Sequence, residues 1–124
     1  MLRRLFSNWA FRPEGNYAGR NLCGCNLAGY DLNHADFSGA DLSGANLEGT
    51  NLSGANLSRA TLRGSHLKGA NLRDANLRSV ILRRAIQAEA DFSGAQLTRF
   101  PKSNNTYLGS TLFRGAILDY DEML

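Results

Sequence analysis

A large apolar residue recurs at every fifth position of this chain, from Tyr17 nearly to its end. The series consists of Tyr17, Leu22, Leu27, Leu32, Phe37, Leu42, Leu47, Leu52, Leu57, Leu62, Leu67, Leu72, Leu77, Leu82, Phe92, Leu97, Tyr107, Leu112 and Ile117. Only Gln87 and Lys102 interrupt it, and neither shifts its register. A period of five matches neither the roughly 3.6 residues of a helical turn nor the roughly 2 of a strand. The chain must therefore turn a corner once in every repeat.

The other positions of the repeat also have fixed characters. Two residues before most of the large residues stands a small residue, often alanine, and we expect both series to point inward. The residue between them is usually Asn or Asp, types that turn the backbone through local hydrogen bonds. Many repeats end in Gly, which favours the corner conformation.

The full pattern, A(D/N)LxG, has its cleanest copies in residues 40–44, 45–49 and 55–59. It resembles the pentapeptide-repeat family over about residues 16–118. The resemblance implies an all-β fold, a right-handed quadrilateral β-helix of about five coils with four repeats, or 20 residues, per coil. Residues 20 apart would then stack at about 4.8 Å in four inward ladders. Leu52 stands in the middle of one ladder, so Lys at this position should prevent folding.

Both ends of a solenoid need covers, because they expose unpaired edges and apolar cross-sections. Leu2, Leu5, Phe6 and Trp9 recur at helical spacing before Pro13. We predict an N-terminal capping helix and linker in residues 1–15, the β-helix in residues 16–118 and a C-terminal tail or cap in residues 119–124. A helix lying on a membrane surface is the alternative for the first segment. No signal peptide or transmembrane run is evident, which favours the cytoplasm.

Two places depart from the repeat. Between residues 100 and 105 the pattern lapses, and Lys102 stands where a buried leucine belongs. Because an unpaired Lys is almost never buried, we expect this segment to bulge outward as a loop while the register survives. Ile86 and Gln87 indicate a milder defect of the same kind.

Near the C-terminus the outward positions become apolar. This candidate surface consists of Leu108, Phe113, Leu118, Tyr120 and Met123. Two interpretations remain open. The tail folds back over these residues as a cap, or the surface forms a two-fold dimer contact, so the protein is a monomer or a dimer through this end.

No catalytic arrangement stands out, because the serines, aspartates and histidines all occupy repeat positions that explain them. We expect no enzyme activity, no cofactor and no metal. His34 and His66 would lie on different coils, which disfavours a shared metal ion. Cys23 and Cys25 are too close in sequence for an ordinary disulfide and too few for a zinc site. We expect Cys25 in the core and Cys23 outside.

The arrangement of charge is more informative than the total of +3. Residues 59–84 hold seven cations and one acid, whereas residues 16–58 hold Arg20 against four acids. Stacking 20 residues per coil would gather six arginines on the same or adjoining faces. We name them the basic belt, a candidate binding surface: Arg59, Arg63, Arg78, Arg83, Arg84 and Arg99. Guanidinium groups hold carboxylates and phosphates by paired hydrogen bonds, but a merely solvated face is the alternative.

These features favour a non-enzymatic scaffold or interaction module that docks an acidic protein. A binder of nucleic acid or of an anionic membrane is an alternative, although no aromatic residues interleave the arginines to stack on bases. The resemblance adds another alternative, because some family members imitate DNA and modulate bacterial gyrase. Those proteins look longer and strongly acidic, unlike this chain. The family is also common as accessory domains in cyanobacteria, which implies a bacterial protein.

Overall fold

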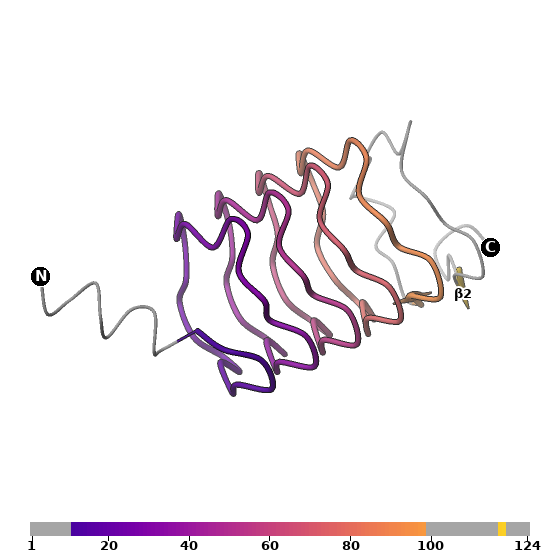
Figure 1. Ribbon diagram of the computed structural model, residues 1–124, viewed down its shortest axis with the longest axis horizontal. Coiled ribbons are helices and arrows are strands. Elements are labelled where there is room, and N and C mark those ends of the chain that lie inside the picture. The colour runs from indigo at the N-terminus through magenta and orange to yellow at the C-terminus, as the bar shows by residue number, and fades with distance from the viewer. Residues whose placement is uncertain (1–10, 99–116, 119–124) are drawn as a thin grey trace, which may run out of the picture.

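The computed structural model describes residues 11–98 and 117–118, which wind into a stack of similar coils (Figure 1). Each coil has four sides, because parallel bridges join residues 20 apart in four columns. We number the sides as faces by these columns: face 1, Asn16–Asp36–Asn56–Asn76–Gln96; face 2, Asn21–Asp41–Thr61–Ile81; face 3, Asn26–Asn46–His66–Ile86; face 4, Asp31–Asn51–Asn71–Asp91. The columns give the 20-residue coil that the resemblance implied.

The corner after each face is a tight turn, shown here by Phe37 to Ala40. The Ala40 amide donates to the Phe37 carbonyl at 3.0 Å, and the Ser38 amide donates to Asp36 Oδ1 at 2.9 Å. Gly39 has φ 66°, the left-handed conformation that the third residue of a type II turn requires. The Asx residue and the glycine of the repeat thus have the turning roles that the sequence predicts.

Backbone hydrogen bonds also join each coil to the next. Phe37 donates its N–H to Asn56 at 2.7 Å, and Asn56 donates to Ala35 at 2.9 Å. Because the chain turns again after each bridge, most faces hold single bridges rather than longer strands. Within the described residues, two strands occur: β1 (Gln96–Leu97) and β2 (Ile117–Leu118), which pair in parallel.

The interior follows the prediction that both series point inward. The large residues of the series from Tyr17 to Leu97 are buried, Leu52 completely, and so are the alanines that stand two residues before them, from Ala35 to Ala95. Thr50 and Ser65 replace Ala in two repeats, and their hydroxyls donate to the carbonyls of Leu27 at 2.8 Å and Leu62 at 2.7 Å. Each buried hydroxyl therefore has an acceptor, and stacked leucine dominates the core.

The predicted outward bulge at Ile86 and Gln87 is wrong. Gln87 keeps its ladder position and is only 3% exposed. The Ile86 carbonyl accepts from Leu67 at 2.7 Å, as at every regular bridge. The inter-coil hydrogen bonds hold the backbone in register whichever side chain stands inside, so a single polar residue does not expel the repeat.

The pairing after Leu97 also differs from the prediction. β1 and β2 join Gln96 to Ile117 and Leu97 to Leu118, residues 21 apart. One extra residue therefore lies between them, and Leu118 rather than Ile117 takes the register position of Leu97. The expectation of an unbroken register to residue 117 is wrong.

Several predictions concern residues outside the described ones. They are the capping helix before residue 11, the loop of residues 100–105, Arg99, and the candidate surface residues Leu108, Phe113, Tyr120 and Met123. Phe11 itself is half-buried against the first coil, with its ring 5.2 Å from that of Tyr17. The domain boundaries stay a prediction. Nowhere in residues 11–98 or 117–118 is there a helix long and apolar enough to cross a membrane.

Candidate interaction surface

Two arginines of the basic belt meet at the corner between faces 1 and 2. The Arg59 amide donates to the Arg78 carbonyl at 2.8 Å, so the two residues occupy successive coils at one corner. Both side chains are exposed. Arg99 lies outside the described residues, so its place in the belt stays a prediction.

The next corner, between faces 2 and 3, carries three more exposed arginines: Arg63, Arg83 and Arg84. The Gly44 amide donates to the Arg63 carbonyl at 2.8 Å, and the Gly64 amide donates to the Arg83 carbonyl at 3.0 Å. Arg63 and Arg83 therefore stack one coil apart, at about 4.8 Å. The structure thus places five belt residues on the two corners that flank face 2.

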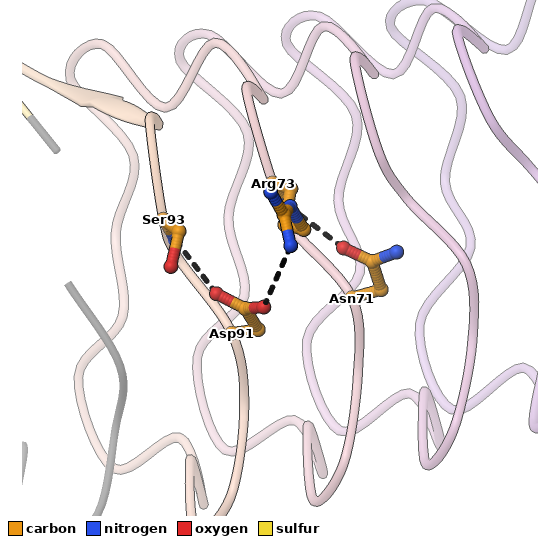
Figure 2. Close-up of polar contacts among 4 residues, drawn as sticks. All are labelled: Asn71, Arg73, Asp91 and Ser93. Atoms are coloured by element: carbon orange, nitrogen blue, oxygen red, sulfur yellow. Dashed lines mark hydrogen bonds and ion pairs between the residues drawn. The ribbon is translucent and has the colours of Figure 1, made fainter. Parts of the chain in front are cut away.

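These five guanidinium groups have no carboxylate within ion-pair distance among the described residues. The ion pair that residues 11–98 do contain lies on face 4, where Arg73 Nη1 is 4.0 Å from Asp91 Oδ2 (Figure 2). Asp91 also accepts the Ser93 amide at 2.9 Å. A hydrogen bond from the Ser93 side chain, and to a lesser degree the Arg73 charge, hold the pKa of Asp91 below its ordinary value. Arg73 thus has a carboxylate partner, and the five belt arginines have none among the described residues.

Two belt arginines occupy a strained backbone conformation. Arg59 has φ 60° and Arg84 has φ 63°, at turn positions where other repeats have glycine. An L-residue costs about 1–2 kcal/mol in this conformation. One coil even has four non-glycine residues at its corners, namely Asp74, Ser79, Arg84 and Glu89. Backbone strain of this kind is concentrated at functional sites, so it indicates this coil as a candidate functional region.

Sequence reasoning missed the apolar part of the surface. Ile81 is 38% exposed and Ile86 is 48% exposed, and they are the large hydrophobic side chains classed as exposed in the described part of the chain. They stand on faces 2 and 3, on either side of the corner formed by Arg83 and Arg84. The sequence did contain a signal, because isoleucine replaces Asn or Asp at both positions. At Ile86 this replacement was interpreted only as a defect of the repeat.

The acids of the first coils do not form a matching patch. Asp31, Asp36 and Asp41 are on faces 4, 1 and 2, and Glu48 follows the bridge residue Asn46 on face 3. The −3 charge of residues 16–58 is therefore distributed around the solenoid, whereas the cations gather on two corners. The net negative charge of these coils therefore does not form one surface.

The cysteines and histidines lie where the repeat predicts. Cys25 is half-buried against the core, and Cys23 is exposed. A hydrogen bond with Asp41 raises the pKa of the Cys23 thiol, which disfavours a reactive thiolate. His34 Nδ1 is 3.1 Å from Asn33 Oδ1. Within the described residues no group of three or more His, Cys, Asp or Glu could hold a metal ion.

Comparison with known proteins gives one family. The family described as pentapeptide repeats matches residues 21–54 and 55–86, and no curated protein matches the chain. A pentapeptide repeat protein from the thylakoid lumen of Arabidopsis thaliana is similar, with 26% identity over 86% of this chain and 73% of its own, and a TM-score of 0.67. A pentapeptide repeat protein from Nostoc shows 31% identity over 92% and 95% of the two chains, with a TM-score of 0.47.

A third solved structure is QnrB1, a plasmid-mediated fluoroquinolone resistance protein. It is 16% identical over 85% of this chain, with a TM-score of 0.53. This chain spans 63% of its length. At that identity the likeness concerns the fold alone.

Proposed function

Because the chain belongs to the pentapeptide-repeat family, whose solved members are right-handed β-helices, we propose that it is a non-enzymatic interaction module. It docks an acidic protein through the basic belt. The observation that carries the proposal is the gathering of five exposed arginines on two adjacent corners, with no carboxylate of the described residues in ion-pair distance. Unneutralised cations held this closely repel one another, and an anionic partner would relieve that repulsion.

The scaffold suits recognition because it is rigid. Arg59, Arg63 and Arg83 are joined to neighbouring coils by backbone hydrogen bonds of 2.8–3.0 Å. A fixed backbone leaves only side-chain freedom to be lost on binding. Guanidinium groups spaced by one coil can each take a carboxylate through two parallel hydrogen bonds.

The proposal includes the two ends of the solenoid. A capping helix before residue 11 and a tail after residue 118 would cover the first and last of about five coils. The sides would then be the surfaces open to a partner, and the basic belt lies on the sides. Modulation of gyrase is a second candidate function, which the fold alone supports. The dispersed acids of the first coils do not favour imitation of DNA.

The test compares variants of equal charge. In the belt variant, Arg63, Arg83 and Arg84 are replaced by Gln. We expect it to bind a synthetic polyglutamate peptide at least about tenfold more weakly than the native protein, by fluorescence anisotropy at moderate salt. Loss of three charge-assisted hydrogen bonds accounts for this magnitude.

The matched control replaces Arg12, Arg20 and Arg73 by Gln. None of these residues belongs to the belt; Arg20 covers the Tyr17 ring at 5.6 Å in the first coil, and Arg73 pairs with Asp91. Both variants lose three positive charges. We expect the control to lose much less affinity. Equal losses would show that net charge alone attracts the peptide, and the proposal would be wrong.

A further inference from the structure

We propose that Ile81 and Ile86 are the apolar anchors of this docking surface, so that the partner is a protein segment in which acidic residues alternate with aliphatic ones. This inference rests on the proposed function of the basic belt. It adds what the charges do not specify, namely the class of anion. A nucleic acid or a polyphosphate has no aliphatic side chains for the isoleucines to contact.

Both isoleucines stand in columns that are polar in the other coils. Ile81 follows Asn21, Asp41 and Thr61 on face 2. On face 3, Ile86 follows two asparagines and a histidine. Faces 1 and 4 keep Asn, Asp or Gln in the same place throughout their columns. The polar column thus gives way to an apolar residue on the two faces that meet at Arg83 and Arg84, and the other faces of the same coil remain polar.

The two side chains are presented by a fixed backbone. Ile81 donates its N–H to Ala60 at 3.0 Å and accepts from Leu62 at 2.7 Å. Ile86 makes the equivalent hydrogen bonds, to Ser65 at 2.9 Å and from Leu67 at 2.7 Å. Neither isoleucine can turn inward, because the inward places next to it are filled. Rigid apolar side chains on an otherwise charged surface are typical of the residues that dominate binding energy.

The arginines lie between the isoleucines in the sequence. Leu82 and Ala85 close the turn at 2.9 Å, and Arg83 and Arg84 are its two central, exposed residues. Going around the coil, the surface therefore reads apolar, cationic, cationic, apolar. A partner segment that crosses this corner is complementary to it when its carboxylates reach Arg83 and Arg84 and its neighbouring aliphatic side chains contact the two isoleucines.

The coils of a second copy do not provide that complement. The acids of residues 16–58, Asp31, Asp36, Asp41 and Glu48, are spread around the solenoid. Asp31 and Asp91 share face 4 but stand three coils apart. The occupant that we propose is therefore a different protein.

Two synthetic peptides of equal length and charge test the proposal, one alternating Glu with Leu and one alternating Glu with Ser. We expect the native protein to bind the Glu–Leu peptide about tenfold more tightly, which corresponds to partial burial of the two isoleucines. The double variant Ile81→Thr, Ile86→Thr should bind both peptides alike. Threonine is accepted in the column of Ile81, as Thr61 shows, and the column of Ile86 is polar in the other coils, so circular dichroism and the unfolding midpoint should report a folded protein.

The outcomes separate this inference from the proposed function. When the belt variant loses both peptides but the isoleucine variant still prefers Glu–Leu, the basic belt stands and the anchors are refuted. When the belt variant binds as the native protein does, both ideas are refuted. A DNA duplex that binds as tightly as the Glu–Leu peptide, with no effect of the isoleucine changes, would overturn the inference in favour of a polyanion.

Discussion

Replacing Arg84 by Gly should stabilise the protein, although it removes a residue of the basic belt. Arg84 has φ 63°, and this conformation costs an L-residue about 1–2 kcal/mol. Glycine adopts it freely but loses about 0.5–1 kcal/mol more backbone entropy on folding. The difference gives a gain of about 0.5–1 kcal/mol in the free energy of unfolding. For a chain of this size we expect the thermal midpoint to rise by about 2–5 °C.

Arg84→Ala is the matched control, because it removes the same charge and keeps the left-handed strain. Gly64, one coil earlier at the same corner, provides the reverse change. A Cβ at Gly64 meets nothing within 4 Å, so Gly64→Ala costs strain alone, about 1 kcal/mol. Urea unfolding of the three variants measures these effects. Equal stability of Arg84→Gly and Arg84→Ala would refute the assignment of strain to this corner.

Three further predictions concern the core, a corner and a carboxylate. Leu52→Ala should lower the free energy of unfolding by about 2–5 kcal/mol in urea titrations, and Leu52→Lys should leave no folded protein by circular dichroism. Gly54→Ala should destabilise more than Gly64→Ala, because its Cβ would lie 2.7 Å from His34 Nε2, and adding His34→Ser should recover the excess. Hydrogen bonds, first from the Ser43 side chain, lower the pKa of Asp41. The native protein should therefore be more stable than Asp41→Asn at neutral pH, and this advantage should vanish as the pH falls below about 4; a constant difference would contradict it.

Periodicity was enough to predict the corners and the interior, and the family resemblance supplied the 20-residue coil. Each inward position depends only on its place in the repeat, and the inter-coil hydrogen bonds enforce that place for all of them. This is why Leu52 was assigned correctly, and why Gln87 remains inside although its polarity indicated otherwise. Whether an irregular repeat stays in the solenoid therefore depends on its hydrogen bonds to the neighbouring coils, not on the polarity of one residue.

The surface was only half predictable. Arginines 20 residues apart could be stacked by counting, so the corner of Arg63 and Arg83 followed from the sequence. In the sequence, Ile86 was interpreted only as an irregularity of the repeat. The exposure of its side chain depends on whether its position in the coil faces inward or outward. The one-residue shift between Leu97 and Leu118 could not be predicted by counting, because Tyr107, Leu112 and Ile117 keep the five-residue spacing in the sequence.

A titration of the protein with isoleucine methyl groups labelled tests the central claim most directly. The isoleucines of the chain are Ile81, Ile86 and Ile117, so each methyl signal can be assigned from single Thr variants. We predict that the Glu–Leu peptide shifts the signals of Ile81 and Ile86 and leaves that of Ile117, in β2, unchanged. Saturable binding with no shift at Ile81 and Ile86 would contradict the claim that this corner is the docking surface.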